Sequence, residues 1–333
     1  MRIGFFGTPD LASQVLQDLM GASDIEVAFV VTNPDKPFGR DQSMRPSAVK
    51  IVSTEYNIPT YTPEKIRWNI EILDIMRSFA CDYFVVVAYG KILPMDVLEI
   101  PKKMCINIHG SILPRYRWAS PIQAALLHGE TETGVTIMNM SEWMDEGDIL
   151  KIRVIAIDTD ETSTTLFEKF AEISGPTLIQ TLRELETGGI TPLPQDHTRA
   201  TYCKKITKEN GLIDWTQSAT DIYHMWQAYT PWPGIYTMYE GKRLLLERVY
   251  VIPGLSQNSS TKHDFLWVSG FLSSQEWQST GKIGQVIKLE DGRIGVICSE
   301  WILTIETVKL EWKKSQNIWD FLNGNQKFIW YTL

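Results

Sequence analysis

Two polar side chains at the end of one apolar run could carry acid–base chemistry. Asn107 and His109 stand two residues apart in the segment NIHGSILP. Side chains alternate along a strand, so both would point to one face while Ile106 and Ile108 point into the core. Histidine takes up a proton near neutral pH, and an asparagine amide can donate to a developing oxyanion. Acyl transfer to an amine needs both functions.

A carboxylate is the usual third group, because it fixes the imidazole tautomer and favours its charged form. The segment MDEGD at residues 144–148 offers Asp145, Glu146 and Asp148. Residue types and spacing alone do not choose among the three. A lone histidine at a strand end is more often structural, but Asn107 beside it strengthens the case for catalysis.

The elements that must position these residues follow an α/β pattern. Nearly continuous apolar runs, as in YFVVVA at Tyr83 to Ala88, are typical of strands buried on both faces of a parallel sheet. Ligands in such sheets bind at the carboxyl ends of the strands. Further strands are predicted at Arg2–Phe6, Ile25–Val31 and Met104–Ile108, with helices over Leu11–Met20, from Pro46 and Ser47 toward Tyr56, and over Thr162–Glu186.

The pattern changes after the last of these helices. Gly188, Gly189, Pro192 and Pro194 predict a boundary, and we expect a catalytic domain at 1–188, a linker at 189–206 and a second domain at 207–333. Beyond it, short strand-like runs separated by turns predict a small β-barrel. These runs are 234–238, Arg243–Val251, 284–287 and 295–298.

Bulk composition is that of an ordinary globular protein with more than one core. The chain has 333 residues and a net charge of -8, with 17 Lys+Arg against 26 Asp+Glu up to residue 190 and 15 against 14 afterwards. The second half is therefore the better candidate for contact with a polyanion. The start MRIGFFGTPD lacks the apolar run of a signal peptide, and no stretch is long and apolar enough to span a membrane.

Cysteine usage favours a reducing compartment. Cys81, Cys105, Cys203 and Cys298 are scattered, with no CxxC pair and no histidine at ligand spacing. We therefore predict a cytoplasmic protein without a zinc site or a disulfide framework.

Around the Asn-x-His segment the sequence resembles the folate-dependent formyltransferases. Their central motif, Asn-x-His followed by Gly-Ser-x-Leu-Pro and Arg-x-Arg, stands here at 107–117, and the resemblance covers nearly the whole chain. Other matching segments are GTPDLA at 7–12, VVAYGKILP at 86–94, TGVTIM at 133–138, DEGDIL at 145–150, IDW at 213–215 and YTPWPG at 229–234.

The resemblance implies a Rossmann-like α/β formyltransferase domain joined to a C-terminal OB-like β-barrel domain. It places the catalytic trio on Asn107, His109 and Asp145, with 10-formyltetrahydrofolate as co-substrate, no metal and a monomeric chain. The flat pterin needs an apolar slot, and we favour that role for Ile92 and Leu93 over the alternative that they are simply core. Folate contacts are implied at Tyr89, Gly90, Ile92, Leu93, Ser111, Leu113, Pro114, Met140, Glu142 and Trp143.

Within this family the acceptor amine is carried either by initiator methionyl-tRNA or by an amino sugar on a nucleotide. The long basic loop between Asn33 and Lys50 matches the tRNA-formylating members, with Gly39-Arg40 at its centre. A solvated charged loop is the alternative. The residues expected to meet tRNA are Lys36, Arg40, Arg45, Lys50, Lys204, Lys205 and Lys208.

Two departures from the family pattern stand out. Trp118 replaces the glycine that most members have after Arg-x-Arg, and the barrel is longer than usual between Val251 and Lys282. Three other interpretations are weaker. The basic loop and the matching C-terminal half argue against a sugar-nucleotide formyltransferase, and an intact Asn107, His109 and Asp145 argues against a catalytically silent RNA-binding protein on this scaffold. The third is a nicotinamide dehydrogenase. The last is the weakest, because Gly4 and Gly7 open no G-x-G-x-x-G pattern.

Overall fold

The computed structural model describes residues 1–38, 42–252, 281–289, 291–329 and 331–333. They form two compact units. The N-terminal unit comprises residues 1–125, 131–159 and 165–205, and the C-terminal unit comprises 126–130, 160–164 and 206–333. Within the described residues, no helix is long and apolar enough to cross a membrane.

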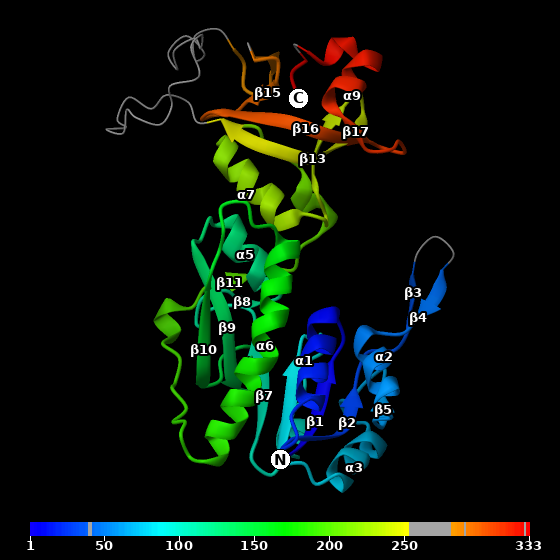
Figure 1. The fold of residues 1–333 in the computed structure, drawn as a ribbon, viewed down its shortest axis with the longest axis vertical. Helices are drawn as coiled ribbons and strands as arrows, with labels where there is room; N and C mark the ends of the chain where they lie inside the picture. The colour runs from blue at the N-terminus through cyan, green and yellow to red at the C-terminus, as the bar shows by residue number, and fades with distance from the viewer. Residues whose placement is uncertain (39–41, 253–280, 290, 330) are drawn as a thin grey trace. The chain divides into compact units, whose positions relative to one another are not determined.

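The N-terminal unit is built on a seven-stranded mixed sheet in the order β10-β9-β7-β6-β1-β2-β5 (Figure 1). Its strands are β1 (Arg2–Gly7), β2 (Glu26–Val31), β5 (Thr60–Tyr61), β6 (Tyr83–Val87), β7 (Met104–His109), β9 (Glu132–Asn139) and β10 (Ile149–Ala156). The pairs from β7 across to β5 are parallel, which confirms the predicted α/β class. The edge made by β9 and β10 is antiparallel and was not predicted.

Helices flank this sheet. They are α1 (Asp10–Met20), α2 (Ala48–Glu55), α3 (Ile70–Ser78), α4 (Met95–Leu98), α5 (Pro121–Leu127) and α6 (Ser163–Glu186). The predicted helix after Pro46 is confirmed as α2, because Ser47 caps it by accepting a hydrogen bond from the Lys50 backbone N–H at 3.1 Å. The predicted helix over Thr162–Glu186 is confirmed as α6.

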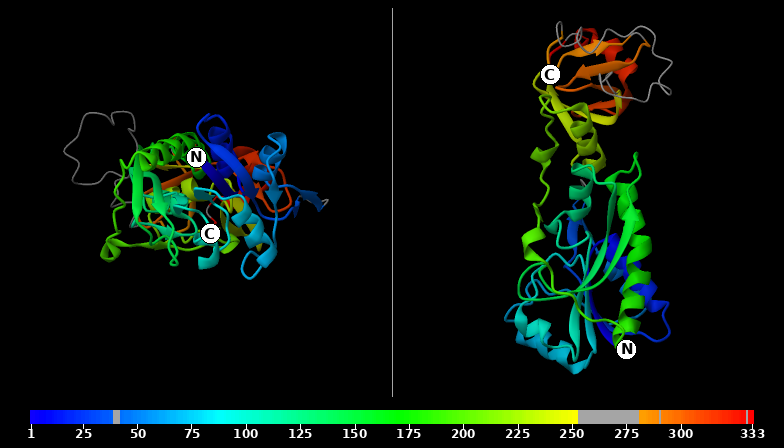
Figure 2. Two further views of the ribbon diagram at one scale, coloured as in Figure 1. Left: turned by 90° about the horizontal axis from the view of Figure 1, so that it is seen from below. Right: turned by 90° about the vertical axis from the view of Figure 1, so that its left-hand side faces the viewer.

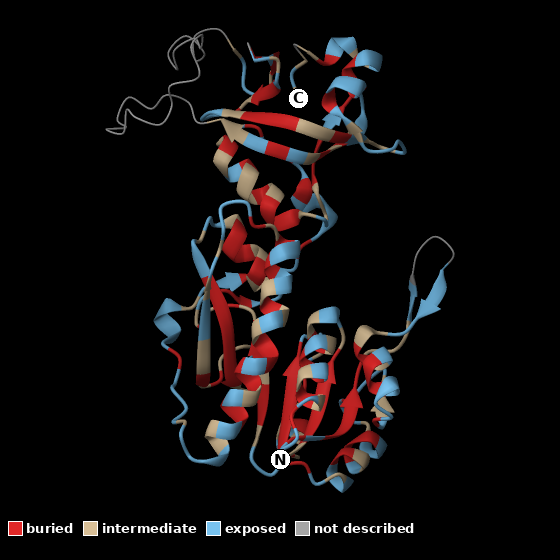
Figure 3. Ribbon diagram, viewed as in Figure 1, coloured by how far each residue is buried: buried red, intermediate tan, exposed pale blue. Residues whose placement is uncertain are grey.

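The core of this unit lies along the central strands, where buried residues follow one another without interruption (Figure 3). Phe6, Phe29 and Phe84 pack ring against ring at the centre. Gly4 makes this possible, because a Cβ at that position would lie 2.4 Å from the Phe29 ring. The sheet that carries β7 therefore has a closely packed core.

The long basic loop predicted between β2 and α2 contains regular structure. It folds into a hairpin of β3 (Lys36–Phe38) and β4 (Ser43–Arg45), in which Lys36 stands opposite Arg45. Arg40 lies outside the described residues.

The C-terminal unit contains a curled antiparallel sheet in the order β12-β13-β16-β15-β14, with β17 paired to β16 (Figure 2). Its elements are α7 (Ala219–Tyr229), β12 (Ile235–Tyr239), β13 (Lys242–Ile252), β14 (Val286–Lys288), β15 (Ile294–Ile297), β16 (Ile302–Leu310), β17 (Gln316–Asn317) and α9 (Ile318–Gly324). All four strand-like runs expected in this half are confirmed as β12 to β15, and the OB-like class is confirmed with them. Most of the lengthened stretch between Val251 and Lys282 lies outside the described residues.

Candidate active site

The last residues of β7 carry the first two candidate groups. Asn107 pairs with Val86 on one side and Met138 on the other, and His109 lies opposite Thr136. The position is the carboxyl end of a parallel strand, where α/β sheets bind ligands. His109 is 6% exposed and Asn107 is half-buried.

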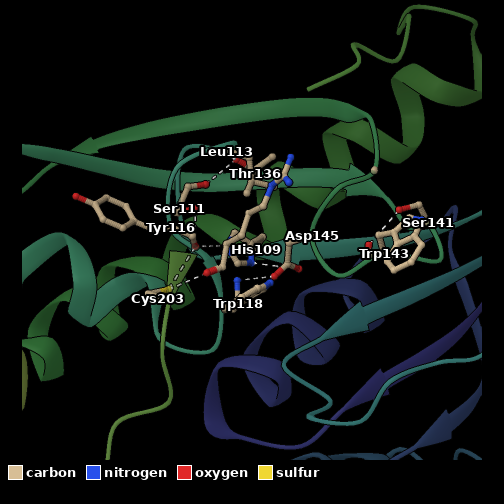
Figure 4. A network of polar contacts seen from close by, with 12 residues as sticks. His109, Ser111, Leu113, Tyr116, Trp118, Thr136, Ser141, Trp143, Asp145 and Cys203 are labelled. Atoms are coloured by element: carbon tan, nitrogen blue, oxygen red, sulfur yellow. Dashed lines mark hydrogen bonds and ion pairs between the residues drawn. The ribbon is translucent and has the colours of Figure 1, made fainter. Parts of the chain in front are cut away.

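The imidazole of His109 faces two acceptors. Its Nε2 lies 2.9 Å from the Tyr116 carbonyl oxygen, and its Nδ1 lies 3.6 Å from Oδ1 of Asp145 (Figure 4). A neutral imidazole has one N–H and satisfies only one of them, whereas an imidazolium donates from both nitrogens. Both ring nitrogens therefore face an oxygen, which fixes the orientation of the imidazole.

Asp145 is the carboxylate that the structure brings to His109. One oxygen faces the imidazole, and the other accepts a hydrogen bond from the Trp118 backbone N–H at 2.8 Å. Glu146 instead faces Arg117, with 3.1 Å between Oε1 and Nη1. Residue types and spacing alone had left Asp145, Glu146 and Asp148 as equal candidates, and the path of the loop separates them.

A set of hydrogen bonds holds the turn that follows β7. The Thr136 hydroxyl donates to the Ser111 carbonyl at 2.6 Å and accepts from the Leu113 backbone N–H at 3.2 Å. The Ser111 hydroxyl donates to the Arg115 carbonyl at 2.6 Å. This turn delivers the Tyr116 carbonyl to His109, so its shape sets the orientation of the imidazole.

Sequence reasoning missed four members of this site, namely Tyr116, Arg117, Thr136 and Gln195. Tyr116 acts through its backbone carbonyl, which no residue type reveals. Arg117 and Thr136 lie within the Arg-x-Arg and TGVTIM segments that carry the family resemblance, so these segments could have indicated them as site residues. Gln195 lies in the expected linker, and nothing in its sequence neighbourhood distinguishes it.

The predicted folate residues divide into three groups. Tyr89 and Leu93 are buried in an apolar cluster with Phe6, and Met140 packs against this cluster. Burial raises the pKa of the Tyr89 hydroxyl to about 12.

The second group belongs to the turn after β7, where Ser111 and Leu113 take part in the hydrogen bonds given above. Pro114 accepts there through its carbonyl, from the Thr201 backbone N–H. The third group is exposed, with Ile92 at 75% and Trp143 at 68%. Gly90, at a φ of 78°, and Glu142 are exposed as well. The roles of all ten residues in folate binding stay predictions.

The predicted tRNA residues are dispersed. Lys36 and Arg45 are exposed on the β3–β4 hairpin, whereas Lys50 forms an ion pair with Asp35 at 2.8 Å. Lys204 and Lys205 are exposed in the N-terminal unit, and Lys208 is exposed in the C-terminal unit. The described residues contain no group of three or more His, Cys, Asp or Glu side chains arranged to hold a metal ion.

The chain matches known proteins along most of its length. The "Formyl transferase" family profile matches residues 1–182, and the "Formyl transferase, C-terminal domain" profile matches residues 205–326. The chain is 36% identical to the methionyl-tRNA formyltransferase of Caldicellulosiruptor saccharolyticus over 97% of each chain. It is 37% identical to that of Sulfurimonas denitrificans over 100% of each.

Solved structures agree on the fold. WlaRD, a sugar 3N-formyl transferase, superposes with a TM-score of 0.61 at 14% identity, over 94% of this chain and 99% of its own. HypX from Aquifex aeolicus in complex with tetrahydrofolic acid superposes with a TM-score of 0.58 at 17% identity, over 99% of this chain. The chain spans about half of HypX, since the match covers 48% of it. With both family profiles matched in order along its length, the chain belongs to the formyl transferase family.

Proposed function

We propose that this protein transfers the formyl group of 10-formyltetrahydrofolate to the α-amino group of initiator methionyl-tRNA. The observation that carries the proposal is the His109–Asp145 pair beside Asn107, at the end of β7. Relatives named as methionyl-tRNA formyltransferases match over the full length, including the C-terminal unit. The product would be the formylmethionyl-tRNA used to begin translation.

The reaction begins with attack of the neutral amine on the formyl carbon. A C–N bond forms, and the carbonyl electron pair moves onto oxygen to give a tetrahedral oxyanion. We assign to Asn107 the donation of its amide N–H to that oxygen, since its side chain makes no hydrogen bond within the described residues. A preorganised donor of this kind lowers the barrier because it is already oriented when charge develops.

His109 accepts the proton that the attacking amine loses. The resulting imidazolium is stabilised by Asp145 and the Tyr116 carbonyl, which face its two nitrogens. When the intermediate collapses, the bond from the formyl carbon to N10 breaks and His109 returns the proton to N10. Tetrahydrofolate and the formylated amine leave, and the enzyme regains its starting state.

We assign pterin binding to the segments that carry Tyr89, Leu93 and Met140, which share one apolar cluster. We assign acceptor binding to the exposed basic hairpin at Lys36 and Arg45, because phosphate contacts by lysine and arginine supply most of the affinity for nucleic acid.

Direct assay tests the proposal. The enzyme is given 10-formyltetrahydrofolate with methionyl-tRNA, uncharged tRNA or an amino-sugar nucleotide, and formyl transfer is measured for each. We expect transfer to methionyl-tRNA alone. Transfer to the sugar nucleotide would identify the protein as a sugar formyltransferase, and no transfer to any acceptor would refute the proposed activity.

A further inference from the structure

Arg117 is a fully buried cation in β8 (Arg117–Trp118), next to the catalytic loop. Its Nε and Nη2 donate to Oε1 of Gln195 at 3.2 and 2.8 Å, and its Nη1 lies 3.1 Å from Oε1 of Glu146. Nη2 also lies 3.3 Å from Nδ1 of His197. A buried guanidinium is tolerated only when its charge is paired, and Glu146 supplies the opposite charge here. The residues that contact Arg117 are therefore needed to keep its charge buried.

Gln195 connects this cation to the loop that carries Asp145. It is buried, and its amide nitrogen donates to the carbonyl oxygens of Asp145 at 2.9 Å and Gly147 at 2.7 Å. The amide carbonyl accepts from Arg117 and both amide hydrogens are used. One side chain thus binds both ends of the turn from Asp145 to Gly147.

The turn needs this support because its backbone is unusual. Asp145 has a φ of 58°, in the left-handed region that a non-glycine residue adopts only when its surroundings enforce it. Gly147 is packed so closely that a Cβ there would lie 1.8 Å from the Asn139 carbonyl oxygen. The left-handed backbone at Asp145 aims its carboxylate at His109.

We infer that Arg117 and Gln195 are positioning residues for the transfer reaction, acting through the backbone of Asp145. The inference rests on the proposed function, since it assumes that the His109–Asp145 pair is catalytic. Gln195 lies between the segments matched by the two family profiles, which end at residue 182 and resume at 205. It serves the active site although it stands 50 residues from Asp145.

The test is Gln195→Glu, which keeps the shape and the acceptor for Arg117 but removes both donors to the loop. We expect kcat for formylation of methionyl-tRNA to fall about 10- to 100-fold, because small misplacement of a catalytic group costs rate on that scale. KM for tRNA should change less than about twofold. Gln227→Glu is the matched control, a buried glutamine of the C-terminal unit whose amide donates to the Glu161 carbonyl at 2.8 Å. It should leave kcat unchanged.

A double-mutant cycle separates positioning from general structural damage. In an Asp145→Asn background, adding Gln195→Glu should lower kcat by less than about twofold, because the carboxylate to be positioned is already gone. Multiplicative losses would overturn the inference, as would a Gln195→Glu enzyme with the kcat of the wild type. Arg117→Lys should resemble Gln195→Glu, since an ammonium cannot reproduce the bidentate contact.

Hydrogen exchange tests the same contacts without relying on activity. Peptides covering residues 139–150 should exchange faster in Gln195→Glu than in the wild type, while peptides from β1 and β6 stay protected. Unchanged exchange in 139–150 would contradict the inference. If the wild type fails to formylate methionyl-tRNA but the loop loses protection, the proposed function fails while the structural role of Gln195 stands.

Discussion

The backbone N–H of Trp118 donates to Oδ2 of Asp145 at 2.8 Å, and Trp118 makes this contact with a φ of 82°. That conformation favours glycine, the residue expected at this position from the family resemblance. The indole ring of Trp118 lies against the ring of Tyr202, with 4.6 Å between the ring centroids. The aromatic contact therefore offsets a backbone strain that the hydrogen bond to Asp145 requires.

Replacing Trp118 tests this balance. Trp118→Gly removes the ring contact but relieves the left-handed backbone, whereas Trp118→Ala removes the contact and keeps the strain. We expect the glycine variant to be about 1 kcal/mol more stable than the alanine variant, which corresponds to a Tm about 2–4 °C higher. Thermal unfolding by circular dichroism measures the order, and an alanine variant as stable as the glycine variant would show that no strain is stored there.

The catalytic pair predicts large losses of rate. His109→Ala and Asp145→Asn should each lower the single-turnover rate of formyl transfer about a hundredfold to ten-thousandfold, the range usual for a lost acid–base group. Asp148→Asn is the control, because it alters a carboxylate three residues away that forms no ion pair or hydrogen bond with His109 within the described residues. Retention of near wild-type rate by either active-site variant would exclude the assigned role.

Acceptor binding should depend on salt and on the hairpin. Removing both charges with Lys36→Ala and Arg45→Ala should raise KM for methionyl-tRNA and reduce the salt slope of log kcat/KM by roughly 1 to 2, since each phosphate contact contributes about 0.9. Activity on a methionine ester should not change. Lys65→Ala removes an exposed charge elsewhere in the N-terminal unit and serves as the control. Equal effects on tRNA and ester would argue against a phosphate contact.

The reactivity of the four cysteine thiols measures how far they are buried. Burial raises the pKa of the Cys81 thiol to about 11 and those of Cys105 and Cys298 to about 12, and it also raises that of Cys203. The reactive species is the thiolate, so raised values mean that the protonated, unreactive form persists at pH 8. We expect no thiol to react with a disulfide reagent in the native protein and four to react in denaturant. Rapid native labelling would contradict the buried placement.

Much of this architecture could be predicted because it rests on local patterns. The apolar run at Tyr83 to Ala88 indicates a buried strand by its composition. The proline and serine before α2 indicate the start of a helix. The pairing of Asn107 with His109 on one face follows from strand alternation alone. Short β strands in the second half were likewise marked by turns between apolar runs.

What could not be predicted depends on contacts between distant residues. Residue types and spacing alone could not select Asp145 over Glu146 and Asp148; the family resemblance selected it, and the left-handed backbone that carries it is indicated by no propensity. The bond between Arg117 and Gln195 spans 78 residues, and Gln195 resembles any polar residue of a linker. The antiparallel edge of β9 and β10 was also missed, because its direction is set by packing and connection rather than by composition.

The parallel pairing of β8 with β11 (Tyr202–Cys203) limits where the chain can be truncated. A fragment ending after α6 at Glu186 would contain all seven strands of the main sheet, together with His109 and Asp145. It would lack Gln195, and it would lack the strand that pairs alongside Arg117. A fragment that keeps the contacts of Gln195 and the β8–β11 pairing therefore extends to at least Cys203, well past the last helix that covers the sheet.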